Sequence, residues 1–198
     1  MHILNEIIKE RFLIIDGAMG TQIQNATIPP EAWGENEGCN ELLNATAPKV
    51  ILNIQKAYCE AGADIIKTNT FGAMDWVLDE YGLGERAYEL AHKGALIAKE
   101  AAKDYAHIKP RFIAGALGPG TKLPSLGHID YDTMHKGYSE SARGLIEGGV
   151  DLFLIETAQD PLQIKAALHA IFDTMEALHV KLPVMVSVTI ELSGSMLI

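Results

Sequence analysis

The chain has 198 residues, of which 48% are hydrophobic, so it can bury a sizeable core as one domain or as part of a larger one. Its formal net charge of −10 argues against a nucleic-acid partner or an anionic membrane, because like charges repel. Its apolar runs are shorter than the roughly 18 residues that cross a bilayer, and its charged N-terminal segment does not resemble a signal peptide. We therefore expect a cytoplasmic protein.

Five short apolar runs alternate with longer stretches of helical periodicity, which is typical of β-α-β units around a parallel sheet. Each run is nearly continuously apolar, as expected of a strand that is covered on both faces. The sequence therefore predicts an α/β fold. The predicted strands comprise residues 12–16, 63–71, 111–117, 151–157 and 183–190.

Four helices are predicted between and after these strands, from their apolar spacing and from residues at their ends. Thr46 is the expected N-cap of the first helix, with Pro48 in its first turn and Gly62 at its end. Asp160 is the expected N-cap of the fourth. The long loop at residues 25–44 has a length that is often functional. The helices are predicted at residues 46–62, 85–103 and 132–149, and from residue 160 onward.

Polar residues gather where the predicted strands end: Asp16 after the first, residues 68–70 after the second, and Glu156 after the fourth. Ligands of parallel α/β proteins bind at the carboxyl ends of strands, and Gly17 and Gly20 would let the backbone approach a ligand closely. Two carboxylates without a metal-ligand pattern indicate a cationic partner, such as a substrate ammonium. A simple Asp-Gly turn is the alternative role for Asp16.

Lys67 lies inside the second predicted strand, where a buried lysine can form a Schiff base with a carbonyl substrate. That role would make the protein an aldolase-like lyase. However, strand side chains alternate between faces, so a slip of one residue decides whether Lys67 points inward. The Schiff-base lyase is therefore kept as a minor alternative.

The sequence predicts no metal site. Cys39 and Cys59 are its two cysteines, and they lie far apart without a C-x-x-C motif, so we expect ordinary thiols. Residues 128–135 contain two histidines and two aspartates in a polar loop that leads into a helix. Solvated loop residues and an N-cap explain this group more simply than a bound metal does.

Five motifs together resemble the homocysteine S-methyltransferase family, and within it the homocysteine-binding barrel of cobalamin-dependent methionine synthases. They follow the order of the family from about residue 13 to the C-terminus. The resemblance implies a TIM-type (β/α)8 barrel, of which residues 1–198 would be the N-terminal portion, truncated after about the fifth strand. The motifs are DGAMGTQIQ, GADIIKTNTFGA, GALGPGTKLPSLG, GGVDLFLIETAQDPLQIKAAL and PVMVSVTI.

The resemblance also implies a substrate site. Asp16 and Glu156 would hold the ammonium of homocysteine, while other residues would position its carboxylate and carbon chain. The zinc-bound thiolate would attack a methyl group carried by cobalamin, and zinc would lower the pKa of the thiol. No catalytic residue can be assigned from the sequence. The implied positioning residues are Gly17, Ala18, Thr68, Asn69, Thr70 and Phe71.

The sequence departs from the family in its metal ligands. The three zinc-binding cysteines of the family have no counterpart here, because their motifs would follow Ile198. Folate and cobalamin domains, which would bind methyltetrahydrofolate and cobalamin, are implied further downstream in the parent protein. We therefore expect this chain alone to be inactive.

A partial barrel would leave two edges unpaired, at residues 12–16 and 183–190, so we expect self-association through these edges. The alternative from another class of protein is a complete doubly wound α/β domain that acts as a ligand-binding module, because five parallel strands would satisfy its strand count.

Overall fold

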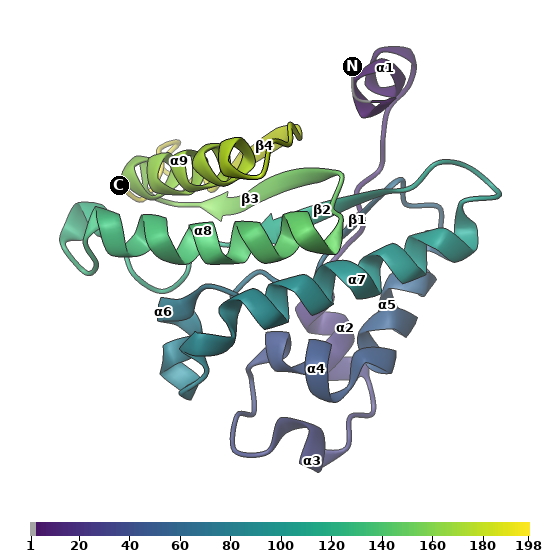
Figure 1. Ribbon diagram of the computed structural model, residues 1–198, viewed down its shortest axis with the longest axis horizontal. Helices are drawn as coiled ribbons and strands as arrows, with labels where there is room; N and C mark the ends of the chain where they lie inside the picture. Colours follow the sequence, from purple (N-terminus) through teal and green to yellow (C-terminus); the bar gives the residue numbers. More distant parts are fainter. Residues whose placement is uncertain (1–2) are drawn as a thin grey trace.

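The computed structural model describes residues 3–198 and has a parallel β-sheet with helices packed against it (Figure 1). Within this range the sheet has four strands in the order β1-β2-β3-β4, and each neighbouring pair is parallel. The predicted α/β class and parallel sheet are confirmed. The strands are β1 (Ile65–Lys67), β2 (Phe112–Leu117), β3 (Leu152–Ala158) and β4 (Val184–Val188).

The first predicted strand, at residues 12–16, is wrong as a full strand. It forms one isolated parallel bridge between Ile15 and Ile65 in the described chain, supported by a 3.0 Å hydrogen bond from the Asp16 amide to the Ile65 carbonyl. The side chains of Phe12 and Ile14 are 96% and 63% exposed. Part of this run is thus exposed, whereas its nearly continuous apolar composition indicated a strand covered on both faces.

Helices and short 3₁₀ turns fill the connections between the strands. The α-helices are α1 (Ile3–Glu10), α2 (Met19–Asn25), α3 (Pro30–Trp33), α4 (Leu43–Thr46), α5 (Pro48–Glu60), α6 (Asp75–Leu78), α7 (Ala87–Tyr105), α8 (Tyr131–Gly148) and α9 (Pro161–Ala177). The 3₁₀ turns are η1 (Asn40–Leu42), η2 (Asp79–Tyr81), η3 (Gly84–Arg86) and η4 (Pro124–Leu126). The four predicted helices correspond to α5, α7, α8 and α9.

The helix ends show which sequence signals were reliable. Asp160 caps α9 as predicted, because its side chain accepts a 2.8 Å hydrogen bond from the Leu162 amide. Gly62 follows α5 with φ of 101°, a conformation that glycine adopts without strain. Thr46 is not the cap of α5. Its hydroxyl instead donates to the Leu42 carbonyl at 3.1 Å, so it ends α4.

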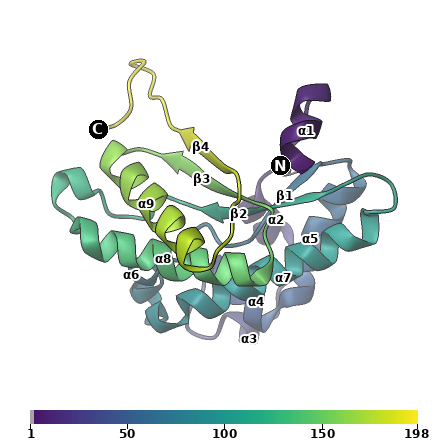
Figure 2. The ribbon, with the colours of Figure 1, turned by 45° about the horizontal axis from the view of Figure 1, so that its top comes forward.

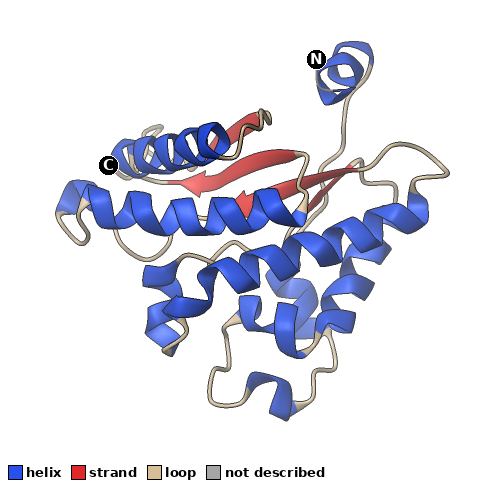
Figure 3. Cartoon of the chain, in the orientation of Figure 1, coloured by secondary structure: helices blue, strands red, loops and turns tan. Residues whose placement is uncertain are grey.

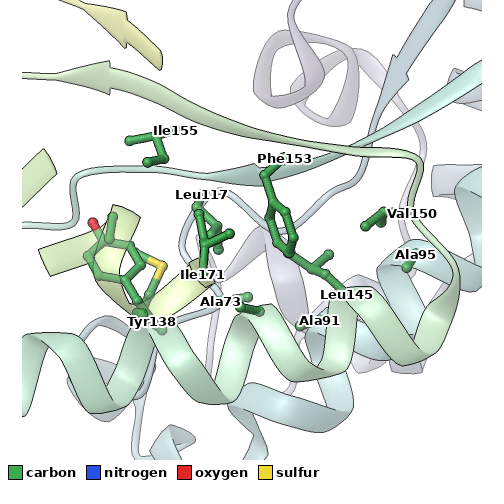
Figure 4. Close-up of a cluster of buried hydrophobic side chains, with 14 of the residues drawn as sticks. Ala73, Ala91, Ala95, Leu117, Tyr138, Leu145, Val150, Phe153, Ile155 and Ile171 are labelled. Atoms are coloured by element: carbon green, nitrogen blue, oxygen red, sulfur yellow. The ribbon is translucent and has the colours of Figure 1, made fainter. Parts of the chain in front are cut away.

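The long helices α5, α7, α8 and α9 lie in chain order along one face of the sheet, each beside the next (Figures 2 and 3). Their apolar faces meet the strands in the main core, where Phe153 and Leu117 contact a layer that includes Leu145 and Ile171 (Figure 4). The opposite face carries a smaller cluster, to which α1 contributes Leu4.

This arrangement contradicts the doubly wound alternative. A doubly wound domain reverses its strand order at a switch point and places helices on both faces of the sheet. Here the strand order follows the chain, and the long crossover helices share one face (Figure 2).

In the described residues, no helix has the length and apolar character needed to cross a membrane.

Candidate functional site

A pocket of about 210 Å³ lies where β1, β2 and β3 end. It brings together six of the eight predicted site residues, although they are spread over 140 positions of the chain, from residue 16 to residue 156. Gly17 and Ala18 lie beside it but do not line it. The lining residues are Asp16, Met19, Gly20, Asn40, Glu41, Lys67, Thr68, Asn69, Thr70, Phe71, Ala116 and Glu156.

Asp16 stands in the pocket wall with one oxygen engaged and the other without a protein partner. Its Oδ2 accepts a 2.8 Å hydrogen bond from the Lys67 amide. Its Oδ1 is buried and has no hydrogen-bond partner in the described chain. Burial raises the pKa of Asp16 to about 7, against the opposing effects of the Lys67 amide and ammonium. A ligand cation at Oδ1 would satisfy this oxygen and favour the ionised carboxylate.

The segment after Asp16 is held against α5. The Tyr58 hydroxyl donates to the Ala18 carbonyl at 2.9 Å. A Cβ atom at Gly17 would lie 2.9 Å from the same hydroxyl oxygen, so a larger residue at this position would displace the Tyr58 ring. Gly17 and Ala18 therefore fix the position of Asp16 and of the backbone that leads into α2.

Glu156 already has a cationic neighbour in the pocket. The Lys67 Nζ lies 2.6 Å from the Glu156 Oε1, and the two side chains are 19% and 17% exposed. Lys67 follows Ile65 by two residues, and Ile65 belongs to the cluster on the face opposite the long helices, so both side chains point to that face. The structure thus resolves the uncertain direction of Lys67 and places it in the site.

The backbone after Glu156 departs from a regular strand. Pairing between β3 and β4 shifts register between Ile155 and Ala158, so the ladder is irregular at this point. Thr157 has φ of 54°, and a β-branched residue rarely adopts this conformation. Such irregularities are common beside functional sites, where they direct a side chain toward a ligand.

The side chains of Thr68 and Thr70 are buried and already hydrogen-bonded. The Thr70 hydroxyl donates to the Ala116 carbonyl at 2.7 Å, and the Ala116 amide donates to the Thr68 hydroxyl at 3.0 Å. The two hydroxyl oxygens are 2.6 Å apart, so Thr68 donates to Thr70. These threonines shape the wall and leave no free hydroxyl donor in this network.

Asn69 joins the wall to the long loop before α5. Its Nδ2 donates to the Asn40 carbonyl at 2.8 Å and to the Asn44 Oδ1 at 3.0 Å. Asn44 in turn donates to the Asn69 carbonyl at 2.8 Å. The amide of Asn69 is therefore occupied in holding the loop over the strand ends. Phe71, which is 43% exposed, lies at the rim of the pocket.

Glu41 is a pocket residue that the sequence analysis missed. Its Oε1 accepts a 2.7 Å hydrogen bond from the Gly72 amide. Burial raises the pKa of Glu41, against the effect of that amide. The length of the loop at residues 25–44 indicated a functional segment, but the single 3₁₀ turn η1 is too short to have a periodicity that could single out Glu41.

The donor set of the described chain does not fit a zinc ion. In residues 3–198, no group of three histidine, cysteine, aspartate or glutamate side chains is placed to hold a metal. Cys39 and Cys59 are buried thiols, and burial raises the pKa of Cys39 to about 11. In the 128–135 group, Asp130 caps α8 and His135 lies 2.9 Å from Asp173. No zinc-dependent step can be built on these residues.

Comparison with protein families matches residues 13–197 to the family described as homocysteine S-methyltransferase. Among curated proteins, the methionine synthase of Mycobacterium leprae is 42% identical over 196 residues, and that of Mycobacterium tuberculosis is 41% identical over the same length. Each alignment covers 98% of this chain but 16% of the relative. The chain therefore spans about a sixth of the length of these relatives.

Solved structures with the same fold include the homocysteine methyltransferase MmuM from Escherichia coli. Its oxidized form gives a TM-score of 0.76 at 19% identity, and its metallated form gives 0.73 at 18% identity. Each match covers 98% of this chain and 68% of the MmuM chain. At this level of identity the likeness concerns the fold.

Proposed function

Because the chain belongs to the homocysteine S-methyltransferase family, we propose that the pocket at the ends of β1, β2 and β3 binds the amino-acid part of homocysteine. In the longer relatives, which are methionine synthases, this binding would serve the formation of methionine. The buried Oδ1 of Asp16, which has no protein partner in the described chain, is the observation that carries the proposal.

The substrate ammonium binds between Asp16 and Glu156 in this proposal. Both carboxyl groups line the same small pocket, and an ammonium has three donors, so it can donate to two carboxylates at once. The remaining predicted residues position the carbon chain and the carboxylate through their backbone and through the shape of the wall. They are Gly17, Ala18, Thr68, Asn69, Thr70 and Phe71.

The four-stranded sheet is, in this proposal, part of a TIM-type (β/α)8 barrel. The sequential order of parallel strands and the single layer of crossover helices are features of such barrels. The segment at residues 12–16, attached to β1 by its one bridge, takes the position of a further strand. Residues 1–198 would then be a portion of the homocysteine-binding domain.

The methyl-transfer chemistry is assigned to other parts of the longer proteins. Zinc supplies thiol activation in the family, but the cysteines of this chain do not form a site for it. Cobalamin, methyltetrahydrofolate and the domains that bind them are assigned in the same way. The residues described here bind and orient the amino-acid end of the substrate, and we expect no turnover from them alone.

Calorimetric titration tests the proposed binding site. Homocysteine should bind the chain at pH 8, and the analogue 4-sulfanylbutanoate, which lacks the ammonium, should bind more weakly. Asp16→Asn should weaken the binding of homocysteine by roughly ten-fold or more, because a charged hydrogen bond to the ammonium is lost. It should affect the analogue much less. Glu176→Gln, which alters an exposed carboxylate on α9, is the matched control. If Asp16→Asn lowered the affinity for homocysteine and for the analogue equally, the proposal would be contradicted.

A further inference from the structure

The charges that line the pocket are unbalanced. Among the described lining residues, Asp16, Glu41 and Glu156 are acidic, and Lys67 is the one lysine or arginine. Homocysteine carries an α-carboxylate next to its ammonium, and three neighbouring carboxyl groups disfavour another anion. A site for a zwitterionic amino acid therefore needs a cation near the acidic groups, and Lys67 has the required charge.

Lys67 also has hydrogen-bonding capacity to spare. Its ammonium has three donors, and Glu156 Oε1 at 2.6 Å accounts for one of them. The side chain is 19% exposed and lines the pocket, so a ligand in the pocket can reach it. Its backbone is fixed as well, since the Lys67 amide donates to Asp16 Oδ2 and its carbonyl accepts from Gln55 at 2.9 Å.

We propose that Lys67 is a substrate-binding residue whose ammonium receives the α-carboxylate of homocysteine while it remains paired with Glu156. This inference rests on the proposed function. It adds a binding partner for the second charge of the zwitterion, the α-carboxylate. The ammonium of the substrate then lies at Asp16 and at the Glu156 carboxylate. Lys67 makes the pocket specific for α-amino acids over simple amines.

The test compares two ligands that differ in the carboxylate alone. Homocysteine and 3-aminopropane-1-thiol share the ammonium, the three-carbon spacing and the thiol, but the second has no carboxylate. The ratio of their dissociation constants isolates the contribution of the carboxylate, because losses common to both ligands cancel. The ratio is measured by calorimetry for the wild-type chain and for Lys67→Met, with Lys67→Arg as the variant that keeps the charge.

We expect Lys67→Met to reduce the preference for homocysteine over the aminothiol by roughly ten-fold or more, since a charge-assisted hydrogen bond to the carboxylate is lost. Lys67→Arg should keep most of the preference. An unchanged preference in Lys67→Met would overturn the proposal and would show that Lys67 only holds Glu156. Failure of the wild-type chain to bind homocysteine would instead refute the proposed function. Lys67→Gln replaces Lys67→Met if circular dichroism shows that Lys67→Met does not fold.

Discussion

At the scale of single residues, Asp16 links the site to the stability of the fold. Burial raises its pKa from 3.8 to about 7. A carboxyl group with a raised pKa contributes its full stability below the unfolded pKa and loses it as the pH rises through the folded pKa. Between pH 5 and pH 8, the wild type should therefore lose on the order of 2–4 kcal/mol of unfolding free energy relative to Asp16→Asn. Urea unfolding of both proteins at the two pH values measures this difference.

Asp130 provides a control of opposite sign for this prediction. Hydrogen bonds from the side chain and amide of Thr133 lower the pKa of Asp130. Its contribution is thus present above the unfolded pKa and is lost in acid, so Asp130→Asn should destabilise the protein at both pH 5 and pH 8. If wild type and Asp16→Asn showed the same pH dependence, the ionisation of Asp16 would not be coupled to folding.

The sequence predicted the carboxylates of the site but not their surroundings. Asp16 and Glu156 were identified because they follow apolar strands, where a buried charge is costly unless it has a partner. The direction of Lys67 was open because alternation along a strand leaves a one-residue ambiguity. Its ion pair with Glu156 joins residues 89 positions apart, and local patterns carry no information on such contacts.

At the scale of elements, the C-terminal end of α9 has a residue whose replacement should stabilise the protein. His179 follows α9 with φ of 55°, its amide donates to the Glu176 carbonyl, and the Val180 amide donates to the Met175 carbonyl. This is the Schellman arrangement, in which glycine is preferred. His179 is exposed, so His179→Gly removes strain and loses no buried contact. We expect the free energy of unfolding to rise by about 1 kcal/mol and the Tm in a thermal melt to rise by about 2–4 °C.

The matched control is His107→Gly, in the exposed turn after α7. Among described non-glycine residues, only Thr157 and His179 have positive φ, so His107 has a conformation that all residues adopt readily. Glycine at position 107 should lower stability by about 0.5 kcal/mol, because it adds freedom to the unfolded chain. If His179→Gly also lowered the stability, strain at the end of α9 would be ruled out.

All four predicted helices correspond to helices of the structure, because helix signals are local. Capping residues and a 3.6-residue period lie within the helix itself, as Asp160 and Pro161 show for α9. A strand depends on partners elsewhere in the chain. Residues 12–16 have the composition of a buried strand, yet they pair with β1 through one bridge and leave Phe12 exposed. Apolar composition predicts a tendency to pair, whereas pairing itself depends on the tertiary fold.

At the scale of the whole molecule, the two ends of the sheet remain open. Among residues 3–198, β4 pairs only with β3, and the bridged segment at residues 12–16 lies beside β1 at the other end. Apolar side chains are exposed at both ends: Phe12 and Ile14 at one, and Val186 and Val188 on β4. Exposed strand edges with apolar side chains favour pairing between molecules.

We therefore predict that the chain self-associates through these edges. Sedimentation velocity should show an average mass that rises with protein concentration, and Phe12→Lys combined with Val186→Lys should shift the chain toward the monomer, because a charged residue at an edge opposes pairing. Leu96→Lys is the control, since Leu96 is 45% exposed but lies on α7 and not on a strand. Equal effects of the edge and control substitutions would mean that general surface hydrophobicity drives association. A wild-type chain that stays monomeric at all concentrations would show that its open edges are already protected, for example by their twist and short length.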